Sequence, residues 1–147
     1  ASTAELAALL SALTEMPLRQ DLAVTGALDQ MGRVQPIGGI NEKVEGFFRV
    51  CRQNGLTGTQ GVLLPLANVQ QLMLSDDVLE AIQARRFYLF PIATVDEAMA
   101  LLTGHPAGER QADGQYPAGT VNGAVELRLR KLVERRLQLS TSDVLAS

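Results

Sequence analysis

The spacing of hydrophobic residues predicts helices separated by short strands along most of the chain. Leucines three and four positions apart predict a first helix over residues 3–14, and the Ser-x-x-Glu pattern that begins at Ser2 is a capping box. A second helix follows Gly38-Gly39 and ends at Asn54-Gly55. The buried face predicted for this second helix consists of Ile40, Val44, Phe47, Phe48 and Cys51.

Short apolar runs between and after these helices predict strands. The runs are residues 21–28, 33–37, 61–65 and 87–92, with a hairpin-like turn at 29–32 between the first two. Two further short helices are predicted over residues 75–84 and 96–102. This alternation predicts a single α/β (α+β) domain over residues 1–104.

The last part of the chain has a different pattern. Residues 105–120 are rich in proline, glycine and alanine, which predicts a connector. Residues 121–147 are predicted to form a C-terminal amphipathic helix and tail that dock on their own domain or on a neighbour. The apolar positions of this helix are Val125, Leu129, Leu132, Val133 and Leu137.

Composition removes several classes of function. The net charge of −3 gives no reason to expect a nucleic-acid partner, and the apolar runs are too short for a membrane span. A single cysteine, Cys51, excludes an internal disulfide, favours a cytoplasmic location and is expected in the core. The single histidine, His105, is expected to be exposed and has no suitably spaced carboxylates for a zinc site. No metal or cofactor is therefore expected in this domain.

Lys43 is one of only two lysines, and it lies at the start of the second predicted helix. On a helical projection it lies about 40° from Phe47 and about 20° from Val50. Apolar surroundings and the positive end of the helix dipole both disfavour the ammonium form, and a neutral amine can act as a general base to a hydroxyl nucleophile. Spacing alone favours the alternative, a lysine whose stem covers the two phenylalanine rings while its amine reaches water.

Two motifs carry a family resemblance. Residues 21–26 read D-L-A-V-T-G, and residues 32–43 read G-R-V-Q-P-I-G-G-I-N-E-K. With the later segments "QGVLLP" (60–65) and "VDEAMALL" (95–102), they make residues 1–104 resemble the proteolytic domain of Lon proteases, which use a Ser–Lys catalytic dyad. The chain most resembles bacterial Lon-like proteins whose serine lies in D-G-D-S-A-S.

The resemblance implies a role for each matching residue. Lys43, which closes the second motif, corresponds to the general base, and Thr25 to the supporting hydroxyl. The family spacing places the nucleophilic serine immediately before Ala1, so that Ala1-Ser2 correspond to the last two residues of S-A-S. Ser2 remains the alternative nucleophile, although the capping box already gives it a structural role. Ala27 stands where many members have an acidic residue.

The resemblance further implies a serine endopeptidase domain, of the ribosomal protein S5 domain 2-like fold, that cleaves protein or peptide substrates. It implies a homo-oligomeric ring such as a hexamer, and ATP with Mg²⁺ only in a region upstream of Ala1. The alternative is a non-catalytic scaffold or assembly module of the same fold.

Overall fold

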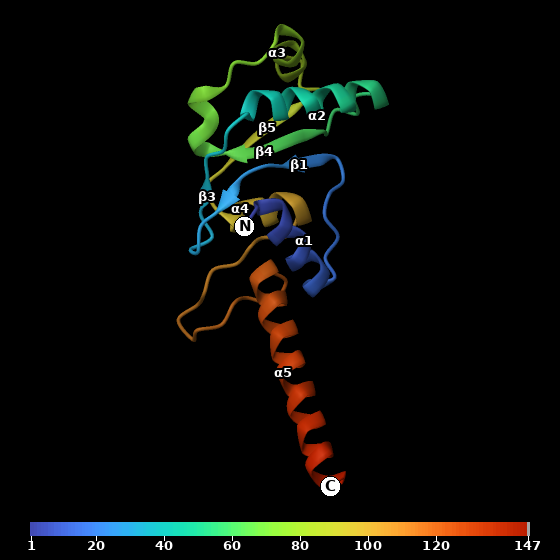
Figure 1. Ribbon diagram of the computed structural model, residues 1–147, viewed down its shortest axis with the longest axis vertical. Helices are drawn as coiled ribbons and strands as arrows, with labels where there is room; N and C mark the ends of the chain where they lie inside the picture. Colours follow the sequence, from blue (N-terminus) through green and yellow to red (C-terminus); the bar gives the residue numbers. More distant parts are fainter. Residues whose placement is uncertain (147) are drawn as a thin grey trace.

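The computed structural model describes residues 1–146 and places a three-stranded parallel sheet between two layers of helices (Figure 1). The strand order is β1-β4-β5, with β1 Leu22–Val24, β4 Gly61–Pro65 and β5 Tyr88–Ile92. One face is covered by α2 and α3, and the other by α1 and α4. The helices are α1 Thr3–Thr14, α2 Ile40–Asn54, α3 Asp76–Gln83 and α4 Val95–Thr103.

The central strand, β4, contributes side chains to two hydrophobic cores, one on each face of the sheet. All five of its residues are buried, as expected for a parallel strand covered on both faces. Val62 and Leu64 pack with α2 and α3, whereas Leu63 packs with α1 and α4. The expected mixed helix-and-sheet domain is therefore present, with the continuous apolar run at its centre.

The helix boundaries follow the end signals in the sequence. Ser2 Oγ accepts a hydrogen bond from Glu5 N at 3.1 Å, and Ser2 N donates to Glu5 Oε2 at 3.4 Å. The predicted capping box of α1 is thus confirmed. Gly39 and Gly55 flank α2 with φ angles of 70° and 90°, a backbone region that favours glycine.

Two predicted strands have different boundaries in the structure. Residues 21–28 do not form one strand, because the chain turns at Gly26, where φ is 142°, and begins β2 (Ala27–Leu28). β2 pairs antiparallel with β3 (Val34–Gln35), which confirms the hairpin-like connection. Phe87 precedes β5 and is instead a core residue, with its ring 5.2 Å from that of Phe48. A 3₁₀ helix, η1 (Leu66–Gln71), follows β4.

The C-terminal helix, α5 (Val121–Ala146), extends away from the domain (Figure 1). Val121 is buried, and Val125 packs against the core formed with α1 and α4. Leu129 and the later apolar positions of the predicted face are exposed in the single chain. The final residue of the predicted tail, Ser147, lies outside the described residues. Over residues 1–146, no helix combines the length and apolar character that crossing a membrane requires.

Candidate active site

A surface hollow of about 330 Å³ lies where β1 ends, beside the first residues of the chain and the start of α2. The carboxyl edge of parallel strands is the usual place for a site in an α/β sheet. Every candidate residue of the family motifs lies in its wall. The lining residues are Ala1, Ser2, Ala4, Val24, Thr25, Gly26, Ala27, Ile37 and Lys43.

The end of β1 holds the start of the chain in place. Thr25 N donates to Leu63 O at 2.9 Å, which continues the β1–β4 pairing by one residue. Gly26 O then accepts hydrogen bonds from Thr3 N at 2.9 Å and from Thr3 Oγ1 at 3.1 Å. The buried Thr3 therefore ties the beginning of α1 to the residue that follows Thr25.

Ala1 and Ser2 are held against β2 by backbone contacts that include an isolated β-bridge. Leu28 N donates to Ala1 O at 2.9 Å, and Ser2 forms an antiparallel bridge with Ala27. The backbone of Ala1 is thus fixed against β2 rather than left free, and Ala1 lies in the wall shared by Thr25 and Lys43. A residue attached to Ala1 N would begin at this hollow.

Lys43 reaches the hollow from the first turn of α2, where its backbone N donates to Gly39 O at 3.1 Å. Within residues 1–146, neither Lys43 Nζ nor Thr25 Oγ1 has a hydrogen-bond partner. The expected apolar flank is only partial, because Lys43 and Val50 are exposed and Phe47 is half-buried. An amine and a hydroxyl are therefore both available at one concave surface.

Sequence reasoning missed a residue that supports the wall of the hollow. Asn68 in η1 is fully buried; its Oδ1 accepts from Ile37 N at 3.0 Å and its Nδ2 donates to Ile37 O at 2.9 Å. The same Nδ2 donates to Gln71 Oε1 at 2.7 Å. Asn68 thus fixes the backbone immediately before Gly38-Gly39 and the α2 start, 31 positions away in the sequence. No local spacing pattern in the sequence signals this pairing.

We expect Asn68→Leu to lower the free energy of unfolding by about 2–4 kcal/mol, because the amide groups of Ile37 lose a buried partner. Asn41→Leu is the matched control: Asn41 also makes two side-chain bonds to backbone, to Gln71 O and Met73 N, but at an exposed site. Its cost should be about 1 kcal/mol. Chemical denaturation of both variants measures the difference, and equal costs would contradict the supporting role of Asn68.

The other candidate side chains lie away from the hollow. Cys51 is buried on α2, as predicted, and burial raises the pKa of its thiol, which suits a core residue. His105 is exposed, as predicted. Among the residues that the structure describes, no three His, Cys, Asp or Glu side chains gather closely enough to hold a metal ion.

Comparison with known proteins gives the same family as the two motifs. Residues 1–103 match the family model described as the Lon protease (S16) C-terminal proteolytic domain. The chain is 41% identical to a putative Lon protease homolog of Haemophilus influenzae over 138 residues, which is 94% of this chain and 22% of that protein. It is 49% identical to a putative Lon protease homolog of Escherichia coli over 102 residues, 69% of this chain and 17% of that protein.

More distant relatives include the archaeal Lon protease of Thermococcus kodakarensis, 35% identical over 69% of this chain and 14% of that protein. The chain spans less than a quarter of the length of each of these three relatives. The Haemophilus match is long enough to include most of the connector and α5, beyond the part that the family model covers. From the family model and these identities, the chain belongs to the Lon protease (S16) C-terminal proteolytic domain family.

Proposed function

We propose that the chain is the serine endopeptidase domain of a Lon-like protease that cleaves protein or peptide substrates with a Ser–Lys dyad. The proposal rests on one observation: Lys43, Thr25 and Ala1 line the same hollow. These residues come from α2, from the end of β1 and from the first position of the chain, so only the fold brings them together.

In the proposed mechanism, the nucleophile is a serine attached directly to Ala1. Lys43 Nζ accepts the serine proton as the hydroxyl oxygen attacks the peptide carbonyl, and then returns the proton to the departing amine. The Thr25 hydroxyl, which has no partner within residues 1–146, would then accept a hydrogen bond from the Lys43 amine and direct this amine toward the serine. Backbone N–H groups near the start of α1 stabilise the oxyanion of the tetrahedral intermediate.

Ser2 is a weaker candidate for the nucleophile, although it also lines the hollow. Its Oγ accepts the Glu5 N–H in the capping box, so the side chain already serves to begin α1. The antiparallel bridge to Ala27 fixes its backbone as well. These contacts favour a structural role for Ser2 and leave the nucleophilic role to the residue before Ala1.

The wider properties of the protease are proposals on the same basis. We infer the ribosomal protein S5 domain 2-like fold, ATP and Mg²⁺ binding confined to a region upstream of Ala1, a homo-oligomeric ring such as a hexamer, and a cytoplasmic location. The alternative function, a non-catalytic scaffold or assembly module, would keep the same core without a serine before Ala1. The polar groups that line the hollow favour the peptidase, since assembly alone requires neither Lys43 nor Thr25.

The test uses the chain extended by its own upstream residues, assayed for cleavage of an unfolded protein and of fluorogenic peptides. We expect cleavage that is lost when the serine before Ala1 is replaced by alanine. Ser2→Ala should keep activity and cost about 1 kcal/mol of stability through the lost helix cap. Absence of a serine at that position, or activity lost only in Ser2→Ala, would overturn the assignment of the nucleophile.

A further inference from the structure

Asn68, which holds the backbone of Ile37, belongs to the same stretch of chain that holds Thr25. Leu63 O, on β4, accepts the hydrogen bond of Thr25 N at 2.9 Å. The 3₁₀ helix η1 begins directly after β4, and Asn68 is its third residue. The segment from Leu63 to Asn68 therefore holds the chain on both sides of the hollow: the end of β1 and the backbone that leads into α2.

The link between Ile37 and Lys43 has little restraint of its own. It passes through Gly38-Gly39, and an added Cβ at the first of these glycines would meet no atom within 4 Å. Two adjacent glycines leave the backbone free to adopt many conformations. The buried Ile40 holds one face of α2 in the core, but apolar contact is non-directional. The directional restraint on this link is the pair of hydrogen bonds between Asn68 and the Ile37 backbone.

The chain after η1 grips α2 on the side opposite to Lys43. Asn41 Nδ2 donates to Gln71 O at 3.0 Å, and Asn41 Oδ1 accepts from Met73 N at 2.7 Å. One turn later, Glu45 Oε1 accepts a hydrogen bond at 2.7 Å from the backbone of the residue before α3. Lys43 lies two positions from each of these side chains, about 160° away around the helix. The segment beside α2 (Figure 1) thus holds the helix and leaves Lys43 on the side of the hollow.

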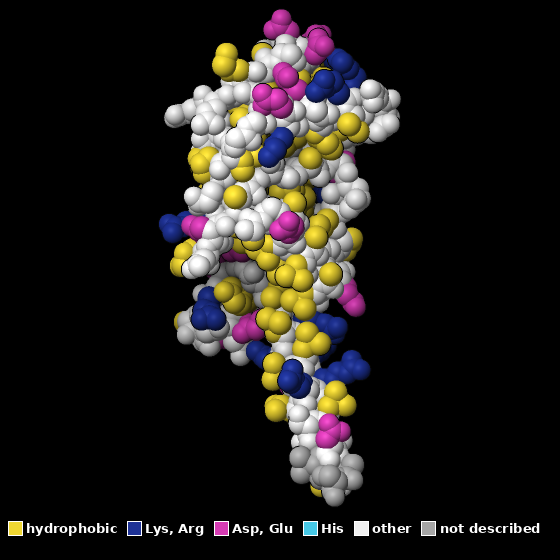
Figure 2. Space-filling view, in the orientation of Figure 1, with side chains coloured by type: hydrophobic (Ala, Val, Ile, Leu, Met, Phe, Trp, Pro, Cys, Tyr) yellow, Lys and Arg dark blue, Asp and Glu magenta, His cyan; other side chains and the backbone are white. Residues whose placement is uncertain are grey.

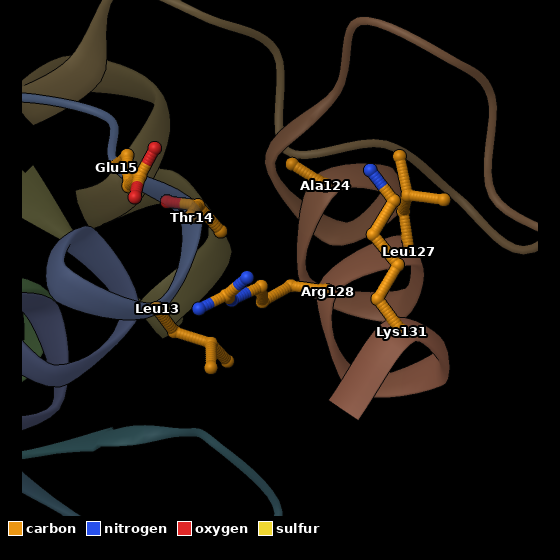
Figure 3. Close-up of a pocket in the computed structure, with 7 residues that line it drawn as sticks. All are labelled: Leu13, Thr14, Glu15, Ala124, Leu127, Arg128 and Lys131. Atoms are coloured by element: carbon orange, nitrogen blue, oxygen red, sulfur yellow. The ribbon is translucent and has the colours of Figure 1, made fainter. Parts of the chain in front are cut away.

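The second lysine of the chain has no comparable support. Lys131 lines a groove of about 200 Å³, and Figure 3 shows that the walls of this groove come from the end of α1 and from α5, with Arg128 reaching toward α1. None of the residues that line the groove is buried. Figure 2 shows lysine and arginine side chains along α5 beside exposed hydrophobic atoms. Of these two lysine-bearing hollows, only that of Lys43 has a wall held by a buried amide.

We propose that Asn68 is a positioning residue of the Ser–Lys dyad: it acts through Ile37 to hold the start of α2, and with it Lys43, where proton transfer from the serine can occur. This inference rests on the proposed peptidase function. Asn68 itself does not line the hollow, so it touches neither the substrate nor the reacting atoms. A general base must lie within about 2.6–3.2 Å of the group whose proton it accepts. Displacement of a catalytic group by about 1 Å can lower a rate about 100-fold.

The test compares Asn68→Leu with Met99→Ala in the serine-bearing protein, at a temperature at which circular dichroism shows both variants to be folded. Met99 is buried in α4, across the sheet from α2, and its truncation also removes core stability. We expect Asn68→Leu to lower kcat and kcat/KM equally, by about 100-fold, which is the pattern of an interaction made only in the transition state. Met99→Ala should keep the parent kcat.

A second variant keeps the inference testable if leucine at this position prevents folding. Asn68→Asp has the shape of asparagine and keeps the acceptor for Ile37 N, but its carboxylate donates no hydrogen bond to Ile37 O. It should lower kcat by at least about tenfold. In the 147-residue chain, which needs no serine for this measurement, the NMR signals of the backbone amides of residues 38–43 should shift in the Asn68 variants and not in Met99→Ala.

The possible outcomes separate the positioning role from the proposed function. If the parent cleaves and the Asn68 variants keep its kcat, or if Met99→Ala lowers kcat as much as they do, the positioning role is wrong and the peptidase function stands. Unmoved amide signals of residues 38–43 would overturn the positioning role without any cleavage assay. A serine-bearing parent that does not cleave would overturn the proposed function, and the positioning role with it.

Discussion

Lys43→Arg should abolish peptide cleavage by the serine-bearing protein while leaving its fold intact. A guanidinium does not release its proton near neutral pH, so arginine cannot serve as the general base. Loss of one member of a catalytic pair costs several orders of magnitude, and we expect cleavage to fall by at least about 10³-fold. Because Lys43 is exposed and has no ion-pair or hydrogen-bond partner within residues 1–146, the free energy of unfolding should change by less than about 0.5 kcal/mol.

The second lysine of the chain provides the control. Lys131 is exposed on α5, away from the hollow of Lys43, and Lys131→Arg makes the same chemical change there. Its cleavage rate should equal that of the parent. Steady-state cleavage and thermal unfolding of both variants give the comparison. If Lys43→Arg retained more than about a tenth of the parent cleavage rate, Lys43 would not be the base. A tenfold loss of rate corresponds to an increase of only about 1.4 kcal/mol in the activation barrier.

Helix ends were the most predictable part of the fold, because their signals are local. The capping box at Ser2 and Glu5 begins α1 where the sequence predicts it. Gly38-Gly39 and Asn54-Gly55 likewise bound α2, since Gly39 and Gly55 adopt positive φ angles that would strain other residues. Such signals act within a few residues and need no knowledge of the tertiary structure.

Burial was harder to predict, because it depends on which surfaces meet. The apolar spacing of α5 correctly predicts a helix, but spacing cannot tell whether Leu129 and Leu132 face the domain or solvent. Phe87 lies in the core through contacts with α2, although its sequence neighbours made it appear part of β5. In both cases the deciding contacts come from residues distant in the chain.

The candidate site contains residues that local motifs reveal and residues that only contacts between distant parts of the chain reveal. The family motifs identify Lys43 and Thr25 from the sequence, and the structure places both in one hollow with Ala1. Asn68 could not be found in this way, since its role depends on the backbone of Ile37, far away in the sequence. Motifs therefore locate the polar groups of the site, whereas the buried groups that hold its wall require the three-dimensional structure.

Gly26→Ala should be among the most destabilising single substitutions in the chain. A Cβ at this position would lie 2.7 Å from Val34 Cγ1, 3.1 Å from Thr3 Oγ1 and 3.3 Å from Pro65 Cγ. The φ angle of 142° adds backbone strain for any residue other than glycine. Overpacking and strain together should lower the free energy of unfolding by about 2–5 kcal/mol, a large part of the stability of a small domain.

The same substitution should also reduce cleavage, because Gly26 O holds Thr3 and therefore the start of α1 beside Thr25. Gly46→Ala is the matched control. Gly46 lies within α2 and has no atom within 4 Å of an added Cβ, so alanine should stabilise the helix by up to about 1 kcal/mol. Chemical denaturation should thus give shifts of opposite sign for the two variants. An unchanged midpoint for Gly26→Ala would mean that the chain at the end of β1 relaxes without cost, and that the wall of the hollow is not fixed by this glycine.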